Sequence, residues 1–255
     1  MARYQLTLAY DGTDFFGSQR QAKRRTVQGE LENALRTLGW MGRSILLSGR
    51  TDTGVHAQGQ VASVDLVWSH ADSDLVRALN STLPGDMSVQ GARIVHDTFH
   101  PRFDATSRTY RYTLFCQPLR DPIRERFAWR VHPAIHKRLL ENSARLFLGA
   151  HNFSAYGSPT SHKGSTVRTV LKAEWIRTEH DEWRFEVRAN AFLYRMVRRL
   201  VFVQVAVAQG KVTAEEVIHS LANQGSAGKR SVLPSGLAPA HGLTLVSVEY
   251  QESTK

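Results

Sequence analysis

The stretch 49–57 (Gly-Arg-Thr-Asp-Thr-Gly-Val-His-Ala) brings together the groups that nucleophilic catalysis needs. The carboxylate of Asp52 lies near the guanidinium of Arg50 and two threonine hydroxyls, between two glycines. Local N–H donors and a nearby cation keep a carboxylate ionised and fixed in place, as a nucleophilic aspartate requires. Glycines allow positive φ and close approach of a substrate. These residue types predict a catalytic loop with Asp52 as the nucleophile.

The same loop is compatible with other structures. Asp52 is equally suited to an Asx-turn, in which its carboxylate only caps backbone N–H groups, and the residues alone leave both possibilities open. Asp52-Thr53-Gly54 also matches the triplet of aspartic proteases. Those enzymes share one proton between two carboxylates in a shielded site, and the neighbouring Arg50 opposes such sharing. A protease is therefore disfavoured.

Phosphate-loop and metal sites are also disfavoured by the sequence. A Walker loop requires Ser or Thr after Gly-Lys, but Val212 follows Gly210-Lys211 and Arg230 follows Gly228-Lys229. His96 and His100 have the spacing of helical metal ligands, yet Pro101 argues against a helix and no third ligand is evident.

Hydrophobic periodicity predicts the elements that position this loop. In the first half we expect strands at 3–10, 44–48, 60–67 and 88–95, and helices at 26–38 and 74–83. In the second half we expect strands at 108–116, 170–177, 182–189 and 243–250, and helices at 133–148, at 192–208 and from Thr213. Thr213 and Glu216 have the spacing of a capping box.

This order predicts an α+β protein with two ferredoxin-like (βαββαβ) lobes. The expected lobes are 1–105, which carries the Asp52 loop, and 106–255. Each would have an antiparallel sheet with helices on one face. The free sheet faces would flank a central cleft able to hold RNA.

Composition limits the partners and the compartment. The chain has 33 Lys and Arg against 23 Asp and Glu, a formal net charge of +10. This charge is suited to an anionic partner such as nucleic acid. Composition alone leaves it equally open that the charges only keep the surface solvated. Cys116 is the only cysteine, so an internal disulfide is impossible, and a buried structural thiol is expected. No stretch is long and apolar enough to span a bilayer. We expect a cytoplasmic protein that does not enter membranes.

Ordered motifs along nearly the whole chain resemble the A-type tRNA pseudouridine synthases. Stretch 49–57 is the most specific of them. The others lie at 10–15 with Gly17 and Gln19, 26–32, 103–105, 107–112, 149–153, 190–192 with 196–198, and 238–243. The chain departs from the family pattern at Ser18, where Trp is usual, and at Phe202, where Gly is usual. The departure at Ser18 is expected to alter an RNA contact. The departure at Phe202 is expected to alter helix packing or a subunit contact.

The resemblance implies that uridine in tRNA is converted to pseudouridine without a cofactor or metal. Asp52 would be the catalytic carboxylate, acting on the sugar or on the base. Tyr110 would stack on the uracil and transfer a proton at the base carbon. Arg198 would pair with Asp52 and lower its pKa. The residues alone favour a core tyrosine at 110, on one strand face with Tyr112, and leave a solvated basic helix face possible for Arg198.

The resemblance also assigns contacts to the RNA. Leu243 would line the uracil pocket, although a core leucine fits nearly as well. Arg50 would fill the place in the stack vacated by a flipped uridine. Other basic residues would contact phosphates or remain solvated; they are Lys23, Arg24, Arg25, Lys163, Arg168, Arg195 and Arg199.

The family's usual substrate is the anticodon stem-loop of tRNA (positions 38–40), and the family acts as a homodimer. A homodimer that binds tRNA is therefore expected here. The main alternative is a non-catalytic RNA-binding module of the same fold. The strand 108–115 only loosely matches the RNP1 pattern of such modules, and a module without catalysis would not need the Asp52 loop.

Overall fold

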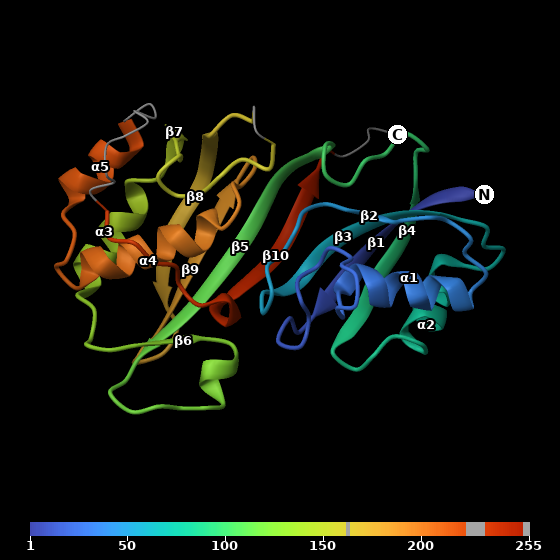
Figure 1. The fold of residues 1–255 in the computed structure, drawn as a ribbon, viewed down its shortest axis with the longest axis horizontal. Helices are drawn as coiled ribbons and strands as arrows, with labels where there is room; N and C mark the ends of the chain where they lie inside the picture. The colour runs from blue at the N-terminus through green and yellow to red at the C-terminus, as the bar shows by residue number, and fades with distance from the viewer. Residues whose placement is uncertain (162–163, 223–232, 252–255) are drawn as a thin grey trace. The chain divides into compact units, whose positions relative to one another are not determined.

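The computed structural model describes residues 1–161, 164–222 and 233–251, which cluster into two compact units (Figure 1). Unit 1 comprises Met1–Thr106 and Thr244–Lys255, and unit 2 comprises Ser107–Leu243. Within the described ranges the chain forms five α-helices and ten β-strands, and most strand pairs are antiparallel. The expected mixture of helices with mostly antiparallel strands is confirmed.

The sheet of unit 1 is built around β1 (Ala2–Tyr10). β1 is antiparallel both to β3 (His56–Leu66) and to β4 (Met87–Val95), so that Leu6 lies opposite Ala62 on one side and Ala92 on the other. The short β2 (Leu46–Leu47) pairs antiparallel with β3. A longer strand at 44–48 was expected, but Ser44 is exposed and only two residues pair.

Two amphipathic helices cover this sheet (Figure 1). They are α1 (Val27–Thr37) and α2 (Asp72–Asn80), and each buries leucines one turn apart, Leu31 with Leu35 and Leu75 with Leu79. The hydroxyl of Thr26 caps α1 by accepting from Gly29 N–H at 3.2 Å. The amphipathic helix expected at 26–38 is confirmed.

The last strand, β10 (Leu243–Tyr250), belongs with unit 1 rather than with the second half of the chain. It starts parallel to β3, with Thr244 opposite His56. Gly59 permits the approach, because a Cβ there would lie 2.3 Å from the Val246 carbonyl oxygen. The expected lobes 1–105 and 106–255 differ from this grouping, since strand order in sequence does not determine which strand becomes the neighbour.

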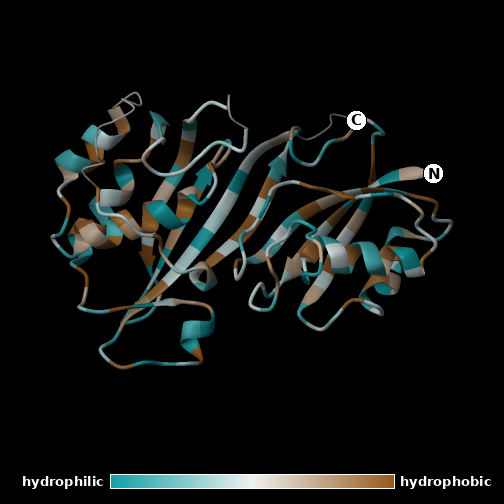
Figure 2. Cartoon of the chain, viewed as in Figure 1, coloured by the Kyte–Doolittle hydropathy of each residue, from teal (hydrophilic) through white to brown (hydrophobic). Residues whose placement is uncertain are grey.

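Unit 2 has a sheet in the order β5 (Ala105–Cys116), β9 (Glu182–Ala189), β8 (Val167–Arg177), β7 (Gly149–Asn152), with antiparallel neighbours. β6 (Trp129–Val131) runs parallel to β5. Hydrophobic and hydrophilic residues alternate along these strands (Figure 2), as expected when one face is buried. β6 and β7 were not expected, because segments of three and four residues carry little periodicity.

Three α-helices, α3 (Lys137–Arg145), α4 (Met196–Ala208) and α5 (Ala214–Ala222), complete unit 2 with the short 3₁₀ turns η1 (Arg124–Arg126) and η2 (Ala240–Gly242). α4 begins later than expected because Arg195 is left-handed, with φ +62°. The capping box of α5 is confirmed, since Thr213 N–H donates to the Glu216 carboxylate and Glu216 N–H to the Thr213 hydroxyl.

Cys116 is half-buried, and burial raises the pKa of its thiol above the usual value. The thiol therefore stays protonated near neutral pH, as a structural cysteine does. Within the described ranges, every helix is too short or too polar to cross a membrane.

Candidate active site

The loop that carries Asp52 connects β2 to β3. Ser48 N–H donates to the Val61 carbonyl at 2.8 Å, and Val55 N–H donates to the Asp52 carbonyl at 3.1 Å, with Gly54 at φ +78°. The turn is thus closed through the main chain of Asp52. The side chain of Asp52 is half-buried and Arg50 is exposed. The loop presents a carboxylate next to a guanidinium that solvent or a ligand can reach.

A buried polar network lies beneath this loop. The Tyr10 hydroxyl is 2.8 Å from Thr51 Oγ1. Gln60 donates from Nε2 to the Gly49 carbonyl (3.1 Å) and accepts at Oε1 from the Ser48 hydroxyl (2.6 Å). Tyr10, Ser48, Thr51 and Gln60 are each at most 6% exposed. Buried polar groups with all partners in place rigidify their surroundings, so the network fixes the main chain on both sides of Arg50.

Ser18 joins the Asp52 loop to the start of α1. Its hydroxyl oxygen accepts from Thr51 N–H at 2.8 Å, and its own N–H donates to the Thr51 carbonyl at 3.1 Å. Its carbonyl accepts from Gln28 N–H in the first turn of α1 at 2.9 Å. Ser18 is fully buried, so its own side chain contacts the interior of unit 1. A small polar side chain fits here because its hydroxyl oxygen supplies the acceptor for the Thr51 N–H.

Two glycines let the segment after β1 approach the loop. Gly17 has φ +81°, and a Cβ there would lie 2.8 Å from the Thr51 carbonyl oxygen. At Gly12 a Cβ would lie 2.0 Å from the Val55 carbonyl oxygen. Nδ1 of the buried His56 lies 3.0 Å from the Gly12 nitrogen and 3.1 Å from a carboxylate oxygen of Asp11, so the ring links the segment after β1 to the start of β3. Residue spacing does not reveal these contacts of His56, because Gly12 is 44 positions away.

The other proposed active-site residues lie in unit 2. Tyr110, in β5, is half-buried, and its ring meets Phe192 edge-on with centroids 5.1 Å apart. Tyr112 is fully buried and donates to the Pro239 carbonyl at 2.8 Å. Burial raises the pKa of Tyr112 well above its usual value. Tyr112 is therefore the core tyrosine of the strand, whereas Tyr110 retains an accessible ring surface.

Arg198 lies in the first turn of α4 and is half-buried. Its Nε donates to the Ala238 carbonyl at 2.8 Å, and its own carbonyl accepts from Ala238 N–H at 3.1 Å. This reciprocal pair fixes the direction of the guanidinium. Leu243, at the start of β10, is only 6% exposed, which is what a core leucine would show.

The two other arginines of this helix differ from each other. Arg199 is only 9% exposed, donates from Nη1 to the carbonyls of Pro234 (2.5 Å) and Gly236 (3.0 Å), and has its pKa lowered by burial. Phe202 packs on Gly236, where a Cβ would lie 2.3 Å from its ring. Arg199 therefore stabilises the segment after residue 232, and its guanidinium is not available to bind phosphate. Arg195 is exposed at the N-terminus of α4, with its guanidinium 4.7 Å from the Tyr194 ring centre.

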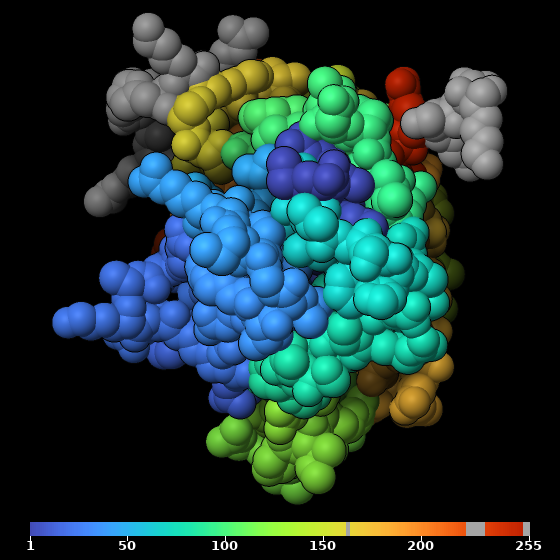
Figure 3. All heavy atoms as spheres, turned by 90° about the vertical axis from the view of Figure 1, so that its right-hand side faces the viewer, coloured from blue at the N-terminus to red at the C-terminus, as the bar shows by residue number. Residues whose placement is uncertain are grey.

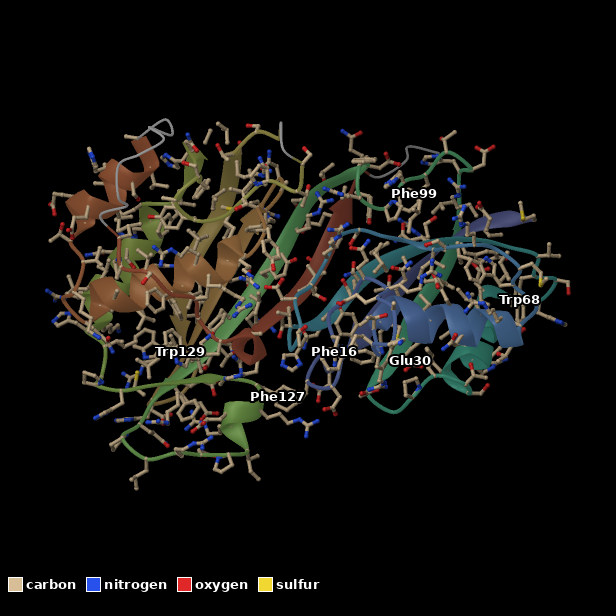
Figure 4. All side chains as sticks on the ribbon, viewed as in Figure 1. Phe16, Glu30, Trp68, Phe99, Phe127 and Trp129 are labelled. Atoms are coloured by element: carbon tan, nitrogen blue, oxygen red, sulfur yellow. The ribbon has the colours of Figure 1, made fainter. Side chains whose placement is uncertain are left out.

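The basic segment 19–25 forms a turn that stands out from unit 1, as the blue protrusion of Figure 3 shows. Arg25 anchors it: two of its nitrogens donate to Asp86 at 2.7 and 2.8 Å and the third to Glu30 at 2.9 Å. Lys23 and Arg24 are exposed, and Arg24 stacks 4.4 Å from the ring centre of Phe16, which is labelled in Figure 4. Arg25 thus has a structural role, whereas its two neighbours face solvent.

Arg168 is half-buried and donates to the carbonyls of Ser165 (2.8 Å) and Val167 (2.6 Å) in its own loop, and burial lowers its pKa. Lys163 lies outside the described residues. His96 and His100 lie in the turn after β4, where His100 Nδ1 accepts from Arg102 N–H. The helix on which paired histidine ligands would depend is therefore not formed.

Comparisons with known proteins point in one direction. A family profile described as tRNA pseudouridine synthase matches residues 7–104, which include Asp52, and 143–251, which include Arg198; Tyr110 lies between the two stretches. Three proteins named tRNA pseudouridine synthase A are similar over nearly the full chain. The relative from Solidesulfovibrio magneticus is 45% identical over 98% of this chain and 92% of its own length. Those from Chloroflexus aurantiacus (98% and 89%) and Methylacidiphilum infernorum (97% and 95%) are each 40% identical.

Proposed function

Since the chain belongs to the tRNA pseudouridine synthase family, we propose that it isomerises uridine in the anticodon stem-loop of tRNA with Asp52 as the nucleophile. The observation that carries this proposal is the Asp52 loop, whose main chain is held by buried partners while the carboxylate is half-buried beside the exposed Arg50. A fixed, ionised carboxylate is the group that nucleophilic catalysis on a sugar or a pyrimidine ring requires.

The reaction conserves the atoms of uridine. The bond between the sugar carbon and the base nitrogen breaks, the base turns, and a bond from the same sugar carbon to C5 of the base forms. The base nitrogen then gains a proton and C5 loses one. One carboxylate is sufficient because the departing base is recaptured, whereas glycoside hydrolysis needs an acid and a base around water.

Tyr110 and Arg198 are proposed to act with Asp52. The half-buried ring of Tyr110, braced by Phe192, would stack on the uracil, and its hydroxyl would move the C5 proton. Arg198 would form an ion pair with the Asp52 carboxylate and orient it toward the uridine. Its bond to the Ala238 carbonyl supports this role by limiting the positions of the guanidinium. Leu243 would close the uracil pocket.

The exposed basic residues are proposed to bind the RNA. Lys23, Arg24 and Arg195 would contact phosphates, which position the RNA without reading its sequence. Arg50 would enter the stack when the target uridine is flipped out, a step that costs a few kcal/mol. Arg25 and Arg199 do not belong to this set, because their guanidinium groups are engaged inside the protein.

The larger assembly is also a proposal. We propose that the two units are ferredoxin-like lobes, that a cleft between their sheets receives the RNA, and that two copies of the chain form the active enzyme. The order β1-α1-β2-β3-α2-β4 in unit 1, with β4-β1-β3 neighbours, supports the lobe assignment.

Loss of the C5 proton provides a direct test. The purified protein is incubated with tRNA transcripts that carry tritium at C5 of uridine, and tritium released into water is counted. We expect release from a transcript with uridines at positions 38–40, and none from a matched transcript with cytidines there. Equal release from a transcript with uridines only in another stem-loop would contradict the proposed substrate site.

A further inference from the structure

We propose that Tyr10 and Ser18 are positioning residues for Asp52, and that they act through Thr51. The proposal rests on the proposed catalytic role of Asp52. It concerns two side chains that do not face the substrate: Tyr10 is 4% exposed and Ser18 is fully buried.

Thr51 is fixed from three directions. Its N–H donates to the Ser18 hydroxyl oxygen (2.8 Å), its carbonyl accepts from Ser18 N–H (3.1 Å), and its hydroxyl meets the Tyr10 hydroxyl (2.8 Å). Thr51 itself is 6% exposed, whereas Asp52, one residue later, is half-buried. The carbonyl oxygen and the side chain of Thr51, the residue before Asp52, are therefore both hydrogen-bonded to buried residues.

The two partners of Thr51 belong to rigid elements. Tyr10 is the last residue of β1, and Met87 of β4 lies opposite it. The Ser18 carbonyl is held by the N-terminus of α1 through Gln28 N–H. Gln60, in β3, holds the other end of the loop at the Gly49 carbonyl. The loop is thus suspended between α1, β1 and β3, the kind of rigid support that keeps a catalytic group in a reactive geometry.

Tyr10 and Ser18 affect the position of Asp52 and not the binding of tRNA. A buried tyrosine hydroxyl and a buried serine hydroxyl have no role in contacting tRNA, so their removal leaves RNA affinity unchanged. Displacement of a catalytic group by about 1 Å costs roughly 100-fold in rate. Burial raises the pKa of Tyr10 above its usual value, and its phenol stays protonated at neutral pH. Tyr10 therefore acts as a support and not as an acid or base.

The test compares Tyr10→Phe and Ser18→Ala with two matched controls. Tyr156→Phe removes another buried tyrosine hydroxyl with a serine partner at 2.8 Å. Ser143→Ala removes another buried serine hydroxyl, which donates to the Leu140 carbonyl at 2.7 Å. We expect kcat to fall roughly 10- to 100-fold in the first pair, with KM for tRNA within twofold of the unaltered protein and the shape of the pH profile unchanged. The two controls should lose some stability but keep the kcat of the unaltered protein.

A double-mutant cycle separates positioning from general damage. Tyr10→Phe and Thr51→Val break the same bond from its two ends, so the double variant should lose no more kcat than the more affected single variant. An unchanged kcat in both Tyr10→Phe and Ser18→Ala would overturn the proposal, as would an equal fall in the two controls. Asp52→Ala is assayed in parallel. Full turnover there would remove the proposed function itself, whereas an inactive Asp52→Ala beside fully active Tyr10→Phe and Ser18→Ala would remove only the positioning role.

Discussion

Neighbouring arginines in this chain have opposite roles, and the difference depends on partners that are remote in sequence. Arg25 reaches Asp86, 61 positions away, and uses all three guanidinium nitrogens within the protein, whereas Arg24 lies on the exposed Phe16 ring. Arg199 holds two carbonyl groups after residue 232, whereas Arg195 is exposed. Residue types alone pointed to the Asp52 loop as a candidate site and left an Asx-turn open. The burial of one basic residue and the exposure of its neighbour could not be predicted, because neighbouring arginines look the same in the sequence.

We therefore expect Arg199→Ala to lower stability and Arg195→Ala to lower tRNA affinity. Arg199→Ala leaves the Pro234 and Gly236 carbonyls without their charged donor, at a cost of about 1.5–3 kcal/mol of stability. Thermal denaturation should show the loss, with little effect on tRNA affinity of the folded fraction. Arg195→Ala should keep its Tm and bind tRNA more weakly. The opposite assignment of the two effects would contradict the distinction.

At the scale of elements, long periodic segments were predicted well and their ends less well. α1, β9 and β10 match the expected positions, because their patterns extend over several turns or alternations. The start of α4 was placed four residues early, since the aromatic and apolar residues before it continue the helical spacing. The segment before α4 is held outside the helix by the left-handed Arg195 and by the bond from Tyr194 N–H to the Ser158 carbonyl, and spacing reveals neither.

The approach of the segment 12–18 to the Asp52 loop predicts unequal effects for two glycines with the same φ. Gly39, at φ +84°, has open space where a Cβ would lie, so Gly39→Ala should cost only the strain of a left-handed residue, about 1–2 kcal/mol. Gly17→Ala, at φ +81°, adds a contact of 2.8 Å with the Thr51 carbonyl oxygen.

Measurement of Tm and kcat for both variants tests this difference. Gly39→Ala should retain kcat, and Gly17→Ala should lose it together with stability. If both variants kept full kcat, the close approach of Gly17 would have no bearing on the loop.

At the scale of the whole molecule, the sequence indicated the class of fold but not the grouping of its parts. The expected second lobe included 243–250, and yet β10 groups with unit 1 through its parallel pairing with β3. Local pattern identifies a strand without identifying its partner, which depends on contacts between residues almost 190 positions apart, such as Thr244 and His56. The net charge of +10, in contrast, is a property of the whole chain that sequence alone supplies.

That charge predicts a salt-dependent affinity for tRNA. Three phosphate contacts, from Lys23, Arg24 and Arg195, correspond to a slope of roughly −2 to −3 in log K against log salt. Raising salt from about 50 to about 200 mM should therefore weaken binding roughly 15- to 65-fold. Arg24→Gln should reduce the slope by about 1. Arg25→Gln should instead lower Tm. A flat salt dependence would contradict the phosphate contacts.

Single-turnover kinetics of Asp52→Asn test most directly whether Asp52 is the nucleophile. With enzyme in excess over tritium-labelled tRNA, the rate of C5 proton release reports the chemical steps without product release. The matched control is Asp97→Asn, an exposed aspartate in the turn after β4. We predict that Asp52→Asn binds tRNA with unchanged affinity and releases no tritium above background, while Asp97→Asn behaves as the unaltered protein. Tritium release by Asp52→Asn at the unaltered rate would contradict the account.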